Sequence, residues 1–145
     1  MKMKINLKYG IDKLLFGMKQ KDVEAIYGKP DRNYKDEDDN QILVYNTLKS
    51  RLTFYQEEDF KLGYVTTTNP VVKLLNTLII GKNWSEVYPV LEKNKVKSFE
   101  TDTSEGMMSY FNEENWLFIH VDYNEIVKIE VGAVFSDKDE FDWKF

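Results

Sequence analysis

The sequence predicts an α+β domain in which two tandem helix-helix-three-strand repeats form one antiparallel sheet with the helices packed on one face. Three observations lead to this fold. The segment that begins at Ile11 matches the segment that begins at Leu75 in its apolar positions and its single glycine. Each repeat opens with apolar residues at helical spacing. The rest of each repeat alternates apolar and polar residues, which is typical of half-buried strands.

The internal repeat extends over most of the chain. A shift of 64 residues places Ile11 on Leu75 and Gly17 on Gly81. Beyond the helices the shift becomes 65, as one inserted loop residue would make it. The pairs are then Tyr45 with Tyr110, Leu52 with Leu117, Phe54 with Ile119 and Leu62 with Val127. We interpret residues 1–145 as a single domain of two repeats, at about 5–68 and 69–135, followed by an acidic and aromatic C-terminal tail.

Each repeat is expected to begin with two helices. The first is short and ends at Gly17 in one repeat and at Gly81 in the other, because glycine takes a left-handed turn without penalty. The second is expected over about 19–28 and 84–94, where Pro89 should kink or shorten it. Strands are expected near 41–47, 51–56, 60–67, 106–112, 116–122 and 125–135.

Composition excludes several classes of function. The net charge is −5 and no basic block is present, which argues against nucleic acid as a partner. Zero cysteines exclude a disulfide scaffold, thiolate zinc sites and thiol catalysis. The most apolar run, residues 71–80, is about half the length that spans a bilayer, and the N-terminus lacks the apolar stretch of a signal peptide. We therefore expect a cytoplasmic protein with no membrane partner.

Part of each repeat resembles a known unit. Phe16-Gly17-Met18 and the segment from Asp22 to Pro30, followed by strands, resemble the unit repeated in β-lactamase-inhibitor-protein-like domains. The same unit resembles the single copy in small outer-membrane assembly lipoproteins, a branch that the missing cysteine removes. The second repeat departs from the motif, with Lys82 in place of the methionine and 92–94 in place of glycine-x-proline.

The resemblance implies a binding protein whose tandem units form a concave sheet that holds a partner. Small acidic cytoplasmic proteins of this kind are similar to immunity proteins that neutralise cognate bacterial toxins. This step is an analogy from fold.

Signals for catalysis or metal binding are weak. The only histidine, His120, lies in an alternating strand, and a serine partner would have to come from a distant residue such as Ser50 or Ser85. The run Asp36-Glu37-Asp38-Asp39 lacks the glycine and the glutamate that a calcium loop needs at its sixth and twelfth positions. No glycine-rich phosphate loop is present. We expect no enzyme, no cofactor and no metal, and interpret the acidic run as a solvated turn that could contact a basic partner.

Strand alternation separates the two faces of the sheet. It assigns Leu52, Phe54, Leu117 and Ile119, with Val127, Ile129 and Val131, to the helix-packed face. The opposite face then carries aromatic and charged side chains of the kinds enriched at binding hot spots, unless the C-terminal tail covers them. The predicted partner-binding residues are Arg51, Tyr55, Trp116, Phe118, His120, Lys128 and Glu130 on this face, with Asp36, Glu37, Asp38 and Asp39 in the acidic loop.

The function predicted from the sequence is a protein-binding inhibitor, an immunity protein that neutralises a bacterial toxin by occluding its active site. A basic nuclease would complement the acidic charge and associate faster. Two alternatives stay open. One is a small-molecule-binding accessory domain, and the other is a hydrolase that uses clustered carboxylates.

Overall fold

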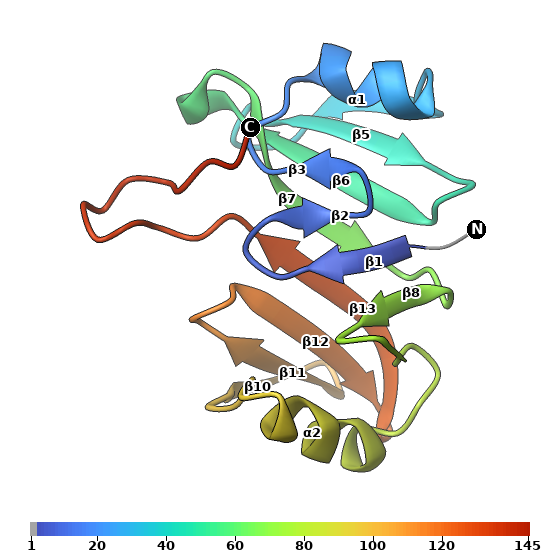
Figure 1. Cartoon of the computed structure of the whole chain (residues 1–145). Coiled ribbons are helices and arrows are strands. Elements are labelled where there is room, and N and C mark those ends of the chain that lie inside the picture. The colour runs from blue at the N-terminus through green and yellow to red at the C-terminus, as the bar shows by residue number, and fades with distance from the viewer. Residues whose placement is uncertain (1–2) are drawn as a thin grey trace.

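A computed structural model describes residues 3–145 and shows a mostly β fold (Figure 1). These residues form thirteen strands in two sheets, a short 3-10 helix, η1 (Gln56–Glu58), and two α-helices, α1 (Gln20–Tyr27) and α2 (Trp84–Lys93). The predicted α+β class, with pairs of helices packed on the face of one sheet, is therefore wrong. No helix in residues 3–145 is long and apolar enough to cross a membrane.

The larger sheet has eight antiparallel strands in the order β10-β11-β12-β13-β7-β6-β5-β4. Its strands are β4 (Arg32–Lys35), β5 (Gln41–Tyr45), β6 (Ser50–Tyr55), β7 (Lys61–Thr67), β10 (Glu100–Ser104), β11 (Met107–Asn112), β12 (Leu117–Asp122) and β13 (Glu125–Gly132). Each half thus contributes four strands rather than three. The halves join edge to edge where β7 pairs with β13.

The smaller sheet replaces the first helix predicted in each repeat. Its order is β3-β2-β1-β8-β9, with β1 and β8 parallel. The strands are β1 (Met3–Asn6), β2 (Gly10–Ile11), β3 (Leu14–Leu15), β8 (Val72–Leu74) and β9 (Thr77–Leu78). Two tight hairpins, β2-β3 and β8-β9, therefore occupy the segments expected to be helical.

Hairpin geometry explains why the apolar spacing predicted helices where the structure has hairpins. Ile11 pairs directly with Leu14 across the β2-β3 turn, so an i, i+3 spacing arises without a helix. Asp12 in that turn has φ 53°, and Leu75 and Asn76 in the other have φ 51° and 63°. These left-handed values are incompatible with a continuing helix. Long-range pairing between β1 and β8 then stabilises both hairpins.

Gly17 and Gly81 do adopt positive φ, 111° and 91°, but each follows a hairpin rather than a helix. The Gly17 N–H donates to the Leu62 carbonyl at 2.9 Å, and the Gly81 N–H donates to the Ile126 carbonyl at 2.8 Å. The two glycines thus tie equivalent turns to β7 and β13. The contacts relate Leu62 to Ile126, not to Val127 as the 65-residue shift predicts.

The core lies between the two sheets. The smaller sheet covers the middle of one face of the larger sheet, with α1 and α2 at opposite ends (Figure 1). The core-facing strand residues Leu52, Phe54, Leu117 and Ile119 are at most 1% exposed, in agreement with the alternation. Val127 is only half-buried because the β12-β13 register shifts between His120 and Val121, and Ile126 is buried instead.

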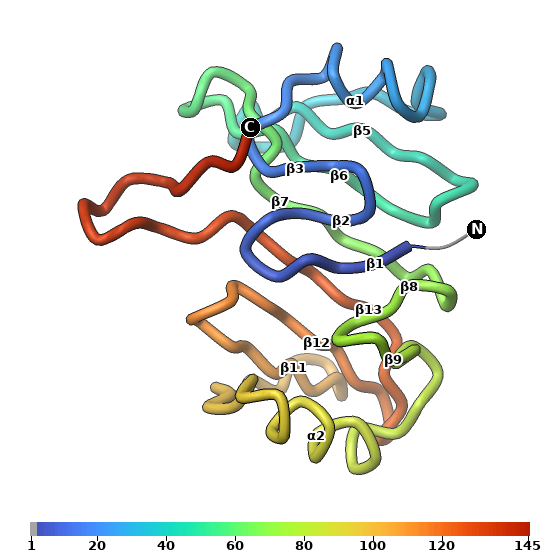
Figure 2. The backbone as a smooth tube through the Cα atoms, viewed as in Figure 1, coloured from blue at the N-terminus to red at the C-terminus, as the bar shows by residue number. Residues whose placement is uncertain are grey.

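Residues 133–145 form the C-terminal loop. It extends from the end of β13 and returns so that the C-terminus lies beside β3 (Figure 2). The Lys144 N–H donates to the Phe16 carbonyl at 2.9 Å. Within the loop, the backbones of Phe135 and Phe141 form an isolated antiparallel β-bridge. The loop is thereby held against the first half of the chain.

Candidate functional site

The face of the larger sheet turned away from the smaller sheet and helices is named the open face. Cross-strand register aligns Arg51 with Thr66, Thr66 with Glu130, and Glu130 with Phe118. Side chains in such a row point to the same side of the sheet. The predicted residues Arg51, Tyr55, Phe118, His120, Lys128 and Glu130 are all half-buried or exposed. They fall into three separate pockets rather than one site.

The central pocket has a volume of about 380 Å³ and contains Phe118, His120 and Glu130. His120 Nδ1 lies 2.8 Å from the Ser109 hydroxyl, and Nε2 is bonded to the Glu130 carboxylate. Glu130 also accepts a hydrogen bond from the Thr66 hydroxyl at 3.0 Å. Burial acts to raise the pKa of Glu130, but the bonds from His120 and Thr66 outweigh it and hold that pKa below its usual range.

Ser109 was missed by sequence reasoning, although the alternation that places His120 on the open face applies equally to its strand neighbour. The proposed serine partners are elsewhere. Ser50 is buried and bonded to Leu48 and Thr67, while Ser85 lies beside Asn124. Ser109, His120 and Glu130 are hydrogen-bonded in the order serine, imidazole, carboxylate, which is also the order in a catalytic triad. However, β11 is hydrogen-bonded to strands on both sides, so its backbone donors do not form an oxyanion hole.

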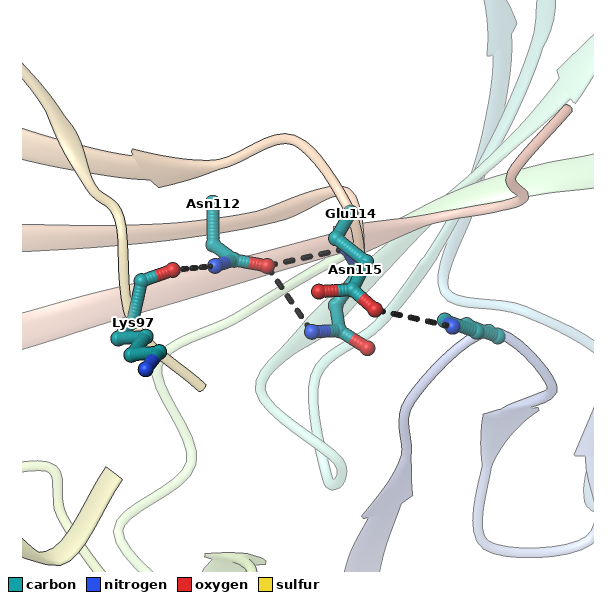
Figure 3. A network of polar contacts seen from close by, with 5 residues as sticks. Lys97, Asn112, Glu114 and Asn115 are labelled. Atoms are coloured by element: carbon teal, nitrogen blue, oxygen red, sulfur yellow. Dashed lines mark hydrogen bonds and ion pairs between the residues drawn. The ribbon is translucent and has the colours of Figure 1, made fainter. Parts of the chain in front are cut away.

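Trp116 lies in the β11-β12 turn with φ 48° and does not project freely into solvent. Its ring packs against Phe111 at 5.0 Å between centroids, and a Cβ on Gly132 would meet it at 2.5 Å. The same turn is held by Asn112, which donates to the Lys97 carbonyl at 2.6 Å and accepts from the Asn115 amide at 2.9 Å (Figure 3). Trp116 therefore packs on Phe111 and Gly132 with part of its side chain and leaves the rest exposed.

The basic pocket has a volume of about 490 Å³ and contains the predicted residues Arg51 and Lys128. Arg32 and Lys49, which sequence reasoning did not select, line it as well. Arg32 lies on β4, an edge strand whose exposed, polar sequence gave no alternation signal.

The acidic pocket joins the acidic loop to the open face. It has a volume of about 430 Å³ and is lined by Asp38, Asp39, Asn40, Tyr55, Glu57, Glu58 and Phe141. Two parts of the sequence prediction, the loop carboxylates and Tyr55, therefore meet. Glu57, Glu58 and Phe141 were missed because only the fold brings η1 and the C-terminal loop to this place.

The four residues of the acidic loop differ in role. Asp36 accepts hydrogen bonds from the backbone N–H groups of Asp38 and Asn40, both at 2.9 Å, and so holds the turn. Glu37 is exposed and does not line the pocket, whereas Asp38 and Asp39 do. In residues 3–145 no group of three or more histidine, cysteine or acidic side chains is arranged to hold a metal ion.

Aromatic packing and one loop contact shape the acidic pocket. Tyr55 lies across Gly63, where a Cβ would be 2.1 Å from its ring. Burial raises the pKa of Tyr55 to about 12, so its phenol stays neutral at physiological pH. The Gln56 N–H donates to the Asn40 side-chain oxygen at 3.0 Å, which fastens the acidic loop to η1. The result is a carboxylate rim beside an aromatic wall.

No family model and no curated protein matches the sequence. Solved structures do resemble the fold. One is an extracellular protein containing an SCP domain from Bacillus anthracis (TM-score 0.55, 16% identity, 81% of this chain and 43% of that chain). Another is a cysteine-rich secretory protein from Staphylococcus aureus (TM-score 0.51, 15% identity, 81% and 44%).

This chain spans less than half the length of either of those two proteins. At such identities the likeness concerns the fold alone. The comparisons and the site therefore define a class, a mostly β protein whose two halves share one large sheet, and not a family. The resemblance to β-lactamase-inhibitor-like and immunity proteins stays a prediction.

Proposed function

We propose that this chain binds a basic protein and acts as an immunity protein, neutralising a bacterial toxin by covering its active-site surface. The observation that supports this function best is the acidic pocket. Four acidic residues, Asp38, Asp39, Glu57 and Glu58, line it together with Tyr55 and Phe141.

The chemistry of the acidic pocket suits a lysine or arginine side chain of the partner. Carboxylates form strong charge-assisted hydrogen bonds with guanidinium and ammonium groups. The rings of Tyr55 and Phe141, which line the pocket, offer apolar contact to the aliphatic part of such a side chain. Phe135, which is 52% exposed and stacks on Phe141 at 4.4 Å, offers apolar contact area next to the pocket.

The charge of the whole chain favours the same partner. A net charge of −5 speeds encounter with a basic surface, such as the substrate channel of a nuclease. In this proposal the chain is an inhibitor and not an enzyme, needs no cofactor, and works in the cytoplasm, where such a toxin would act on its producer. Neither nucleic acid nor a membrane is its partner.

Co-expression tests the proposal. Each protein encoded by a gene adjacent to that of this chain is produced in a bacterial host, alone and together with this chain. We expect one of them to stop growth when alone and to be tolerated when this chain is present.

The Asp38→Asn variant should restore growth less well, whereas Glu37→Gln, which makes the same charge change outside the pocket, should protect like the wild type. Two outcomes would contradict the proposal. One is that no neighbouring product is toxic, and the other is that toxicity persists in the presence of the wild-type chain.

A further inference from the structure

The basic pocket carries an unusual concentration of positive charge for an acidic chain. Arg32, Lys49, Arg51 and Lys128 line it, and no acidic residue does. The whole chain has 25 acidic and 20 basic side chains, so composition does not explain why every charged residue of this lining is cationic. Like charges gathered at one place repel one another unless opposite charges offset them.

None of these four cations forms an ion pair in the part of the chain from residue 3 to residue 145. Two carboxylates on neighbouring segments are hydrogen-bonded to other groups. Asp31 accepts a hydrogen bond from the Asn46 N–H at 2.7 Å, and Glu130 is bonded to His120 and Thr66. The charge of Lys128 also contributes to the lowered pKa of Glu130, so part of the positive charge is offset at longer range. In residues 3–145 none of the four cations is in direct contact with a carboxylate, so the cations can still pair with an anionic ligand.

Strand register directs the two arginines to the same side. Arg32 on β4 pairs with Val44 on β5, and Val44 pairs with Arg51 on β6, so both arginines project from the open face. The Arg32 guanidinium lies 4.8 Å from the centroid of the Tyr34 ring, which orients it. Lys49 reaches the pocket from the β5-β6 turn, where its φ is 48°.

We propose that the basic pocket binds a small soluble molecule that carries a phosphate group. Arginine guanidinium groups match phosphate oxygens in a bidentate manner, and lysine adds point charge. The volume of about 490 Å³ lies within the roughly 300–1,000 Å³ usual for small-ligand pockets. Tyr34 and Val44 in the lining provide apolar surface for the rest of such a molecule.

This inference goes beyond the proposed function and does not depend on it, because the acidic and basic pockets share no lining residue. Binding at one can be lost while binding at the other persists. The same anion chemistry could also come from a lipid headgroup, and the experiment includes that source.

The test is a titration of the isotope-labelled full chain with phenyl phosphate and with inorganic phosphate, at constant ionic strength, followed by NMR of the backbone amides. Phenol serves as the uncharged control. We expect saturable shifts that cluster at Asn46, Lys49, Arg51 and Thr66 with both phosphates and none there with phenol. Arg51→Gln should weaken binding about tenfold or more, since a charge-assisted contact is lost.

The matched control is Lys93→Gln, which makes the same charge change at an exposed position on α2 and should bind like the wild type. Circular dichroism would verify that both variants are folded. Shifts scattered over all basic residues, or equal weakening in both variants, would overturn the proposal. So would binding only to vesicles that contain phosphatidic acid and not to the free phosphates.

Discussion

Phe141 of the C-terminal loop packs against Tyr55 of β6, with 5.6 Å between their ring centroids. Phe141 also stacks on Phe135 at 4.4 Å and on Trp143 at 4.9 Å. The contact makes the last part of the chain a wall of the acidic pocket. Docking of the C-terminal loop and integrity of the proposed binding surface are therefore coupled.

Replacing Phe141 with alanine should loosen the C-terminal loop. The change removes three aromatic contacts, each of which contributes roughly 0.5–1.5 kcal/mol, so we expect the free energy of unfolding to fall by about 2 kcal/mol. Urea unfolding measures this loss. Phe145→Ala is the control, because that terminal side chain is 61% exposed and should change stability little. Equal stability of the Phe141 variant and the wild type would contradict the account.

We predict that the position of the Tyr55 ring requires a glycine at position 63. An alanine Cβ would lie 2.1 Å from the tyrosine ring, so Gly63→Ala must displace the ring and should cost about 1–3 kcal/mol of stability. The same substitution should cost much less in a Tyr55→Ala background, where the ring is absent. A double-mutant cycle by chemical unfolding measures the difference. Additive effects of the two substitutions would show that the ring is not what excludes a side chain at Gly63.

Glu130 should make stability depend on pH in the acid range. Its pKa in the folded chain is below the usual value, so its bonds to His120 and Thr66 stabilise the fold above the unfolded pKa of about 4.3. That contribution is lost as the pH falls through the lower, folded-state pKa. Urea midpoints measured from pH 7 down to pH 3 should decline more steeply for the wild type than for Glu130→Gln. Equal slopes for the two proteins would show that the fold does not stabilise the ionised form of Glu130.

The sequence predicted the central strands well and the hairpins badly, for a physical reason. Strands β6 and β12 have one face in the core, and their alternation is a local consequence of that burial. The hairpins β2-β3 and β8-β9 are held by the parallel β1-β8 pair, a contact between distant segments that leaves no local pattern. Edge strands β4 and β10 are largely exposed and likewise lack alternation.

The candidate site was predictable to the same extent. Alternation correctly placed Arg51, Phe118 and Glu130 on the open face, yet it could not divide them among three pockets. Ser109, Glu57 and Phe141 reach their pockets only through the fold. The acidic loop and Tyr55 are separate in the sequence, and the β5-β6 pairing and the Asn40–Gln56 hydrogen bond bring them together.

Isothermal titration of the purified toxin partner with this chain tests the central proposal most directly. The proposal predicts that Asp38→Asn weakens binding about tenfold or more, because it loses a charge-assisted contact within the acidic pocket. Glu37→Gln, in the same turn and with the same charge change, should bind nearly as the wild type does. Wild-type affinity in the Asp38 variant, or an equal loss in both variants, would contradict binding through the acidic pocket.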